Sequence, residues 1–494
     1  MDVTSASPQL AAPARERLAA DLRAALGSGS VLTERAELLA YGFDASFLEA
    51  TPDIVTLPRT PDEVARAARI ATDAGAPVVA RGSGTGLCGG AVPIRGGVVI
   101  STARLNHIRR IDAINRLAVV EPGVINVMLS EAARPYGLYY APDPASQRIS
   151  SIGGNVATNA GGPHCLALGA TAAHIVAVQV ALPDGQLIWL GDENGALNTS
   201  GYDLLGAVIG SEGTLAIVTQ IVTRLLPLPE SVRTLLAIFP DIATGSAAVS
   251  AIIGAGIVPS ALEMMDRTIC QAVERAFHAG YPEDAGSVLL IEVDGPREMV
   301  EAQAERIAII CAMSGARETR VARSEAERAA LWAGRKGAAA ALGQFTSSFY
   351  LQDAVVPRSR LPQIMERVEE IAAEYGLLIP NVFHAGDGNL HPNMVFDRRK
   401  PGDIERVMRA GNDLLKACVD LGGMVSGEHG IGLEKRDAMS YVFSARDLAS
   451  MAQVRLAFDP HELFNPDKIF PESAACLEAR APVGLASGVN AWFC

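Results

Sequence analysis

Apolar positions along the chain alternate between short strand-like runs and helical spacing. From residue 53 to 229 the runs are rich in β-branched residues, which is typical of strands. A helix is predicted over 64–74, because its apolar residues recur at helical spacing after the capping box Thr60-Pro61-Asp62-Glu63 and stop at Gly75. The predicted strands of this mixed α+β domain are 53–58, 77–80, 97–102, 117–123, 175–185 and 214–227.

A second pattern of alternating strands and helices begins at Thr234. Strands are predicted over 234–239, 257–264 and 287–293, and helices over 241–254 and 296–313, with a further helix between the last two strands. This order favours a ferredoxin-like half with its sheet covered on one face. The section 321–470 is mostly helical in pattern. We therefore expect an α+β protein with four parts: a helical lead-in at 1–48, a first domain at 49–229, a second domain at 230–471 and a loosely ordered tail at 472–494.

Length, composition and charge narrow the class of protein. A chain of 494 residues is too long for one core, and 49% hydrophobic with 20% charged residues is ordinary for a soluble globular protein. The net charge of −13 argues against nucleic-acid binding. We expect no membrane-spanning helix and no signal peptide, because the chain has no run of 18 apolar residues and no apolar stretch after a basic start. Seven scattered cysteines without a CxxC pair favour a reduced, cytoplasmic setting.

Two loops of small residues stand out in the first domain. Gly84–Gly89 matches G-x-G-x-x-G, but that fingerprint needs a helix starting inside the loop, and Gly89, Gly90 and Pro93 follow at once. We therefore predict a loop that wraps its own N–H groups around a pyrophosphate, with a flexible surface turn as the alternative. A second such loop spans 150–162. Two such loops indicate a long ligand that the backbone approaches closely.

The strongest polar motifs are HAGDGNLHPN (384–393) and SGEHGIG (426–432). Asp387-Gly388 is a favoured two-residue turn, which predicts a hairpin with His384 opposite His391 and Cβ atoms about 5 Å apart. That separation suits chelation of one metal ion, and Glu428 is the candidate third ligand. Two imidazoles and a carboxylate describe a catalytic zinc-type site, which manganese or iron would also fit. His429, whose side chain is turned away from Glu428, is the candidate proton acceptor. The alternative is that these histidines cap turns or satisfy buried backbone groups.

The glycine motifs RGSGTGLCGG (81–90) and IGGNVATNAGG (152–162), closed by YDLLGAVIGSEGTLAIVT (202–219), resemble the FAD-binding domain of the vanillyl-alcohol-oxidase, or PCMH, type. The resemblance implies a two-subdomain FAD-binding fold whose first loop holds the pyrophosphate and whose second loop lines the flavin. Covalent members carry a histidine where Thr85 stands, so FAD is expected to be bound non-covalently. The residues implied in cofactor binding are Arg81, Gly82, Ser83, Gly84, Thr85, Gly89, Gly90, Pro142, Gly154, Asn155, Asn159, Gly213, Thr214 and Ile217.

The histidine motifs resemble the C-terminal domain of FAD-linked oxidases, a group that includes D-lactate dehydrogenases, D-2-hydroxyglutarate dehydrogenase and the glycolate oxidase flavin subunit. The resemblance implies a divalent metal on His384, His391 and Glu428, with His429 as base. Arg335 in LWAGRK matches the arginine that binds the substrate carboxylate, a task suited to a planar guanidinium. Asn465 in LFNPDKIFP matches a residue that returns to the flavin. The alternative for Arg335 is a solvated arginine on a helix face, and the alternative for Asn465 is a plain turn before Pro466.

The implied reaction is the oxidation of a short D-2-hydroxy acid. Leu351 stands where the hydroxyglutarate type has a lysine, which favours glycolate or D-lactate, and FYLQDAVVP (349–357) looks closest to the glycolate oxidase flavin subunit. The alternatives are D-2-hydroxyglutarate dehydrogenase, an ether-lipid synthase on the same scaffold, and a flavin-carrying subunit without chemistry of its own. The electron acceptor would be a quinone, a cytochrome, an electron-transfer flavoprotein or an iron–sulfur subunit. Any iron–sulfur cluster would lie on another chain, because this sequence has no cluster-binding cysteine pattern. We expect a homodimer or hetero-oligomer that is cytoplasmic or peripheral at the inner membrane through partner subunits.

Overall fold

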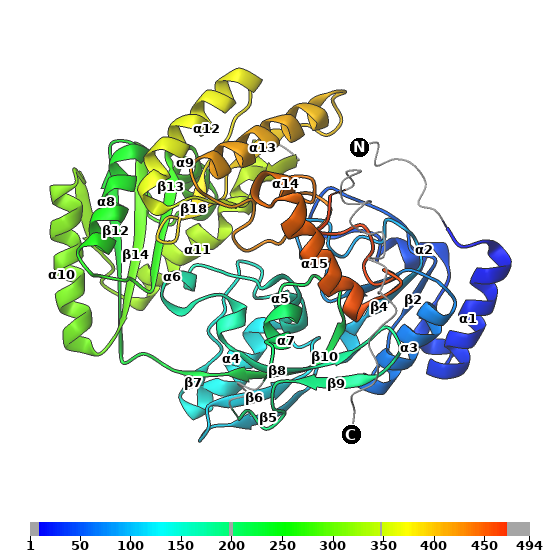
Figure 1. The fold of residues 1–494 in the computed structure, drawn as a ribbon. Coiled ribbons are helices and arrows are strands. Elements are labelled where there is room, and N and C mark those ends of the chain that lie inside the picture. The colour runs from blue at the N-terminus through cyan, green and yellow to red at the C-terminus, as the bar shows by residue number, and fades with distance from the viewer. Residues whose placement is uncertain (1–8, 197–200, 346–347, 472–494) are drawn as a thin grey trace.

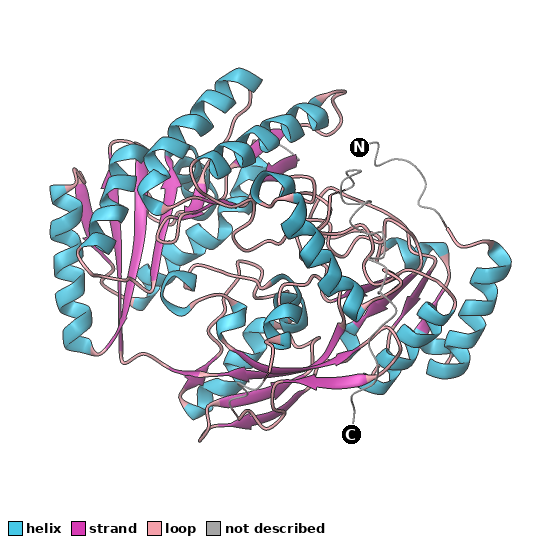
Figure 2. Ribbon diagram, viewed as in Figure 1, coloured by secondary structure: helices cyan, strands magenta, loops and turns pink. Residues whose placement is uncertain are grey.

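The computed structural model describes residues 9–196, 201–345 and 348–471. Helices and sheets are mixed throughout these residues, as the α+β prediction requires (Figure 2). A four-stranded and a five-stranded sheet make up most of the first domain, and a seven-stranded sheet makes up most of the second (Figure 1). Each domain also has a two-stranded sheet, β7 with β11 (138–139 and 226–227) in the first and β16 with β20 (348–351 and 393–396) in the second. No helix among the described residues is long and apolar enough to cross a membrane. The predicted tail at 472–494, with Cys476 and Cys494, lies outside the described residues.

The first sheet of the first domain has the strand order β1-β2-β4-β3, with β2, β4 and β3 parallel and β1 antiparallel at the edge. Thr60 accepts a hydrogen bond from the Glu63 N–H, so α3 begins where the capping box predicted. The segment expected to be only a lead-in completes this layer, because Leu18 and Leu22 of α1 are buried in its core. The elements are α1 (Ala12–Leu26), β1 (Val31–Leu32), α2 (Arg35–Leu39), β2 (Ile54–Thr56), α3 (Pro61–Asp73), β3 (Val78–Arg81) and β4 (Val98–Ser101).

The second sheet is antiparallel, with the order β5-β6-β10-β8-β9. The second glycine loop, predicted to be irregular, contains the helix α5 (Ile152–Thr158). Ser151 caps this helix through the Gly154 N–H, and Ile152 and Val156 bury one face of it in the core. The cap and the burial of Ile152 and Val156 thus override the low helix propensity of the glycines in this seven-residue helix. The other elements are β5 (Ile108–Asp112), β6 (Leu117–Val120), α4 (Asn126–Ala133), β7 (Leu138–Tyr139), α6 (Cys165–Leu168), β8 (Ile175–Ala181), β9 (Leu187–Leu190), α7 (Leu204–Val208), β10 (Ile217–Arg224) and β11 (Leu226–Pro227).

The second domain begins with the predicted ferredoxin-like half. Its four strands are antiparallel in the order β15-β12-β14-β13, and the sheet continues through β18, β19 and β17. The elements of this half are β12 (Ser231–Phe239), α8 (Ile242–Gly254), β13 (Ala261–Asp266), α9 (Arg267–Phe277), β14 (Ser287–Gly295), α10 (Arg297–Met313) and β15 (Glu318–Val321). The remaining elements are α11 (Glu325–Ala341), β16 (Ser348–Leu351), β17 (Ala354–Val355), α12 (Leu361–Tyr375), β18 (Val382–His384), β19 (Asn389–Leu390), β20 (Asn393–Phe396), α13 (Asp403–Asp420), α14 (Met439–Val442) and α15 (Ala445–Phe458).

The prediction that this sheet is covered on one face is wrong. Leu235 and Ala237 of β12 lie in the core shared with α8, α10 and α12. The alternate residues Leu236 and Ile238 lie in a second core with α9 and α11. A strand buried on both faces carries a continuous apolar run rather than an alternating one, and β12 is buried from Thr234 to Phe239.

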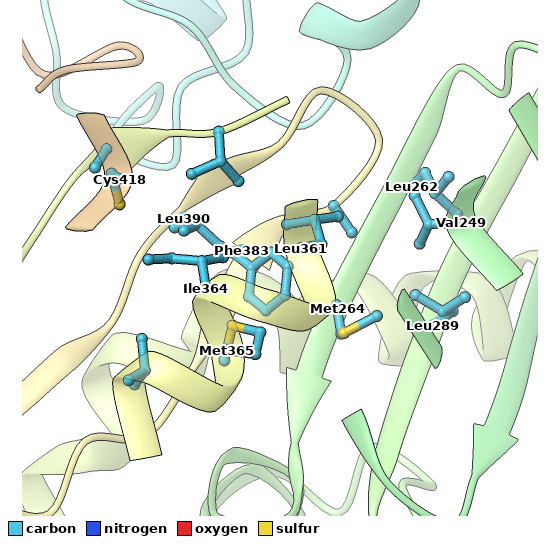
Figure 3. Close-up of a cluster of buried hydrophobic side chains, with 14 of the residues drawn as sticks. Val249, Leu262, Met264, Leu289, Leu361, Ile364, Met365, Phe383, Leu390 and Cys418 are labelled. Atoms are coloured by element: carbon cyan, nitrogen blue, oxygen red, sulfur yellow. The ribbon is translucent and has the colours of Figure 1, made fainter. Parts of the chain in front are cut away.

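The larger core holds the strand that carries the first motif histidine. Phe383 is fully buried among Leu361, Met365 and Met264 (Figure 3). Because successive side chains of a strand point to opposite faces, burying Phe383 on one face directs His384 to the other. Packing of β18 against β13 therefore sets the position of the motif.

The last described residues return to the first domain. After α15 the chain runs beside β3, where the Val78 N–H donates to the Leu463 carbonyl (2.8 Å) and the Asn465 N–H donates to the Val78 carbonyl (2.7 Å). Phe464 is buried in the core of the first sheet. Residues predicted within the second domain thus tie it to the first.

Phe383→Ala tests the role of this core. We expect the free energy of unfolding to fall by about 3–5 kcal/mol, because the substitution leaves a cavity. The measurement is chemical or thermal denaturation beside Tyr202→Ala, whose side chain is 95% exposed and should change stability by less than about 0.5 kcal/mol. Equal shifts for the two variants would contradict this account of the core.

Candidate active site

The structure brings the three predicted metal ligands together. His384 ends β18, His391 follows β19, and Glu428 lies in the loop after α13. The Nε2 atoms of His384 and His391 lie 3.1 Å and 3.0 Å from the same oxygen, Oε1 of Glu428. One ligand atom from each residue lies within 4.8 Å of the other two, with both histidines buried. Two imidazoles and one carboxylate at these distances fit a divalent cation of the zinc type.

The hairpin that presents the histidines differs from the prediction. His384 pairs with Asn389 and not with His391, so the turn has four residues. The Gly386 N–H donates to the Leu262 carbonyl, which extends the edge of β13, and the Gly388 carbonyl accepts from the Val356 N–H. These bonds to neighbouring strands prevent the tight Asp387-Gly388 turn. The imidazoles nevertheless meet, with ring centroids 5.0 Å apart and planes at 86°.

A buried carboxylate that sequence reasoning missed supports His384. Glu263 of β13 is the cross-strand partner of His384 and is fully buried. Its oxygens lie 2.8 Å and 2.9 Å from Nδ1 of His384, which leaves Nε2 directed at Glu428. Such a carboxylate–histidine contact orients a metal ligand and raises its basicity. No motif marks Glu263, because ALEMMD reads as an ordinary buried strand.

Glu263 also holds the predicted substrate-binding arginine. Arg335 of α11 donates from Nε to Glu263 (2.7 Å), and its Nη2 lies 2.5 Å from the same carboxylate. The guanidinium is therefore buried and ion-paired, which excludes the alternative of a solvated helix-face arginine. Two of its five donors are used in this pair, which leaves others for an anion.

The site concentrates negative charge. Burial opposes a charged His384, but Glu263 and Glu428 together raise its pKa well above the usual value. Burial raises the pKa of Asp387 to about 6, and the neighbouring Glu263 and Glu428 contribute to that rise. A divalent cation among these carboxylates would offset the charge, which further fits a metal site.

Asp353 organises the loop that carries Glu428 and His429. It is fully buried and accepts hydrogen bonds from the backbone N–H groups of residues 427–429, from Ser426 and from the Lys435 ammonium. Burial opposes its charge, but Lys435 and His429 lower its pKa. Asp353, His391 and His429 also lie close enough to hold an ion. The lone pairs of Asp353 are already engaged, so we favour the set with Glu428.

His429 lies beside the metal set without sharing its contacts. Its ring stacks on that of His391, with centroids 5.0 Å apart and planes at 5°. Nε2 of His429 is 3.8 Å from Glu428 Oε1, longer than the contacts of the other two histidines. Burial lowers the pKa of His429 to about 4, against the opposing effect of Asp353. A neutral imidazole of this kind can accept a proton at neutral pH.

A cavity of about 670 Å³ opens beside these residues. Glu428 and His429 line one part of it, and the first glycine loop, α5, Glu212-Gly213 and residues from 43–45 and 144–149 line other parts. No helix begins in the first glycine loop, which confirms that it is not the dinucleotide fingerprint. A cavity walled by glycines and backbone groups fits a long cofactor such as FAD. Of the predicted cofactor residues, those that line it are Gly82, Ser83, Gly84, Thr85, Gly90, Gly154, Asn155 and Gly213.

The other predicted cofactor residues are not among those that line this cavity. Arg81 and Ile217 line an adjoining pocket of about 50 Å³ that shares Gly82, Gly154 and Gly213 with the cavity. The guanidinium of Arg81 lies under Gly84 and donates to the Phe43 carbonyl (2.6 Å), so it supports the loop. Asn159 ends α5 in the left-handed region, with φ of 51°. Pro142 accepts from Asn126, Thr214 donates to Ser211, and Gly89 abuts Leu48 and Leu433.

Glu212 and Asn465 join the cavity wall to the second domain. The Glu212 carboxylate accepts from the Ile431 and Gly432 N–H groups, both at 2.7 Å, which ties the cavity to the SGEHGIG loop. Asn465 donates to the carbonyls of Gly90 (2.8 Å) and Glu212 (2.6 Å). Asn465 thus braces two segments of the wall. Sequence reasoning missed Glu212, although its place in GSEGT marked it as a residue of a tight loop.

Comparison with known proteins finds matches over both domains. Residues 52–191 match the family model of the FAD binding domain, and residues 228–469 match that of the FAD linked oxidases, C-terminal domain. The glycolate oxidase subunit GlcD of Escherichia coli is 43% identical, over 90% of this chain and 88% of that protein. A D-lactate dehydrogenase of Anaerostipes hadrus is 32% identical, over 88% of this chain and 91% of that protein. The solved structure of p-cresol methylhydroxylase shares the fold, with a TM-score of 0.79 at 16% identity over 93% of this chain and 98% of that one.

Glu263→Gln tests the support of His384. We expect about 10- to 100-fold weaker binding of a divalent metal, because the imidazole loses its charged partner. The measurement is calorimetric titration of the chelator-treated protein with Zn²⁺ or Mn²⁺. Glu318→Gln on β15 of the same sheet, where the side chain is 47% exposed, serves as the control and should bind metal as the wild type does. Unchanged affinity in Glu263→Gln would contradict the assignment.

Gly86→Leu tests the cavity. A Cβ at Gly86 would have only Asp44 Oδ2 near it, at 3.8 Å, so the added side chain enters the cavity without strain in the protein. Overfilling costs about 1–3 kcal/mol, which corresponds to about 5- to 150-fold weaker FAD binding. The readout is the ratio of flavin to protein absorbance. Gly29→Leu, where nothing lies within 4 Å of an added Cβ, should keep its flavin. Full flavin content in Gly86→Leu would show that the cofactor lies elsewhere.

Proposed function

Because this chain belongs to the FAD-linked oxidases, we propose that it oxidises a short 2-hydroxy acid, glycolate or D-lactate, to the corresponding 2-oxo acid. The family makes it an FAD-dependent oxidoreductase that acts on hydroxy acids. The observation that carries the proposal is the position of Glu428 and His429. They line the cavity that fits FAD, and Glu428 joins the two ligand histidines.

The proposed cofactors divide the chemistry between the two domains. FAD, held non-covalently because Thr85 stands in the first loop, supplies the acceptor for the substrate hydride. The glycine loops and α5 would bind it through backbone N–H groups, and Ser83, Thr85 and Asn155 add polar side chains to the wall. A divalent cation, zinc or else manganese or iron, supplies Lewis-acid polarisation of the substrate hydroxyl. His384, His391 and Glu428 would hold it.

His429 is the proposed base. Its imidazole is neutral at pH 7 because burial lowers its pKa to about 4, so it can accept the hydroxyl proton. Stacking on His391 fixes the plane of its ring beside the metal ligands. Its backbone N–H is held by Asp353 (3.0 Å), which limits movement of the loop during proton transfer.

Arg335 is the proposed carboxylate-binding residue. Its pairing with Glu263 keeps the guanidinium oriented beside His384, and its remaining donors would bind the substrate carboxylate. Leu351 stands where a second substrate carboxylate would need a cation, which supports a short acid over D-2-hydroxyglutarate. The relatives named as glycolate oxidase subunits and D-lactate dehydrogenase support the same substrate class.

Electrons must leave the reduced flavin for an external acceptor. The E. coli relative is named as a subunit of glycolate oxidase, which supports a hetero-oligomer for this chain. The proposed acceptor is a quinone, a cytochrome, an electron-transfer flavoprotein or an iron–sulfur subunit. In this arrangement the chain would be cytoplasmic, or peripheral at the inner membrane through its partners.

Anaerobic flavin reduction tests the function. The holoenzyme should bleach its flavin with glycolate or D-lactate, and His429→Asn should lower the rate constant of reduction by about 100- to 10,000-fold through loss of the base. His278→Asn, an exposed surface change at a position with φ of 50° that asparagine tolerates, should react as the wild type does. Equal rates for the wild type and His429→Asn would overturn the mechanism. No reduction by any D- or L-2-hydroxy acid would favour a flavin-carrying subunit without chemistry of its own.

A further inference from the structure

A polar cluster outside the site connects the two domains. His164 lies immediately before α6 of the first domain, and its Nδ1 is 2.9 Å from Oδ2 of Asp143 in the same domain. On its other side, Nε2 is 3.6 Å from Oε1 of Glu292, on β14 of the second domain. One imidazole therefore spans the boundary between two carboxylates.

The second domain holds Glu292 in a fixed position. This carboxylate is buried and accepts from Trp332 Nε1 (2.7 Å), from Thr234 Oγ1 (2.5 Å) and from Nε and Nη2 of Arg328 (2.9 Å and 2.8 Å). The Trp332 ring also stacks on the His164 ring, with centroids 5.7 Å apart and planes at 24°. Four donors from its own domain leave Glu292 little freedom, so its contact with His164 is well defined.

The helix that contributes to this cluster also carries the active-site arginine. Arg328, Trp332 and Lys336 follow one another at four-residue spacing on α11, so they share one face. Lys336 Nζ lies 3.9 Å from Asp143 Oδ2 and 5.6 Å from the centre of the Trp332 ring. Arg335, next in the chain to Lys336, is directed at Glu263 and so at His384. Any shift of α11 against the first domain would therefore move Arg335.

The segment around His164 also touches the metal site. Gly161 lies against the Glu428 side chain, where a Cβ would collide with it. Leu166 of α6 packs on Gly386, in the turn between the two ligand histidines. The contacts of residues 161–166 thus reach both motifs of the second domain. Gly161 also lines the cavity that fits FAD.

We propose that His164 is a positioning residue that fixes the second domain, with its metal ligands and Arg335, against the domain that holds FAD. This role rests on the proposed function, because hydride transfer requires the substrate and the flavin to meet at a set distance. His164 takes no part in the contacts described above for the metal set, His429 and Arg335, because its partners are Asp143 and Glu292. Displacement of about 1 Å at a reacting centre can slow a reaction about 100-fold.

The charges around His164 support this role. Burial opposes a charged ring, but Asp143 and Glu292 raise the pKa of His164 to about 10. The charged groups facing the ring are Asp143 of the first domain, Glu292 and Asp294 of β14, and Arg328 and Lys336 of α11. Since the folded-state pKa is raised, the stabilisation is full below the unfolded value of about 6.5 and is lost as the pH rises through about 10. At pH 7 the contact is ionic.

His164→Gln in the holoenzyme tests the proposal, because glutamine keeps the bulk of the side chain and removes the charge. We expect wild-type FAD and metal content, with the rate constant of flavin reduction at saturating glycolate or D-lactate lowered about 100-fold. Hydrogen–deuterium exchange of segments 161–168 and 325–341, measured in the oxidised enzyme without substrate, should rise about tenfold or more. His107→Gln is the matched control. His107 contacts Glu121 at 2.8 Å, and both residues lie in the first domain, so neither readout should change by more than about twofold.

Exchange decides the proposal independently of turnover. Unchanged exchange in His164→Gln would overturn it, even if the rate fell. Faster exchange with an unchanged rate of flavin reduction would also overturn it, because docking would then not limit the reaction. Should the wild type be reduced by no hydroxy acid, the proposed function fails while exchange still shows whether His164 holds the domains together. If His164→Gln does not fold, Asp143→Asn, which leaves Glu292 and its four donors intact, is measured in the same way.

Discussion

The convergence of two imidazoles on one oxygen of Glu428 is the contact on which the rest of this structure depends. His384 and His391 come from one edge of the second-domain sheet, whereas Glu428 comes from a loop after α13. Each of these two segments is held in place by a different buried carboxylate. Glu263 orients His384 from β13, and Asp353 binds three successive N–H groups of the Glu428 loop. Two buried carboxylates that do not line the neighbouring cavity thus determine where the two histidines and Glu428 meet.

Burying either carboxylate carries a desolvation penalty, and in each case a buried cation offsets that penalty. Glu263 is paired with Arg335, and Asp353 is paired with Lys435. Removing one member of such a pair leaves an uncompensated charge, which is far more destabilising than removing both. Arg335 neutralises Glu263 in this pairing, and the donors that the pair does not use remain for the proposed substrate carboxylate. The ion pair of Glu263 and Arg335 therefore affects both the stability of the fold and the charge of the proposed site.

The site lies where two domains meet, so its geometry depends on their docking. Glu212 reaches from the cavity wall to the SGEHGIG loop, and Asn465 returns from the end of the second domain to brace Gly90. His164, immediately before α6, bridges the boundary through Asp143 and Glu292. The chain crosses between the domains more than once, because residues after α15 add to the core of the first sheet. A cofactor held by one domain and ligands held by the other can then keep a constant separation.

The sequence by itself determined the mixed α+β fold class, the glycine-lined cavity and the histidines and glutamate that cluster beside it. Local patterns in the sequence predict these features: the apolar periodicity, a glycine-rich loop that does not start a helix, and histidines beside turn residues. Only the tertiary structure decided the turn between the histidines, the helix within the second glycine loop, the cover on both sheet faces and the tasks of Glu263, Glu212 and His164. The physical reason is that register, burial and charge pairing are set by neighbours distant in the chain. Glu263 lies 121 residues from His384, and no local pattern records that they share a strand pair.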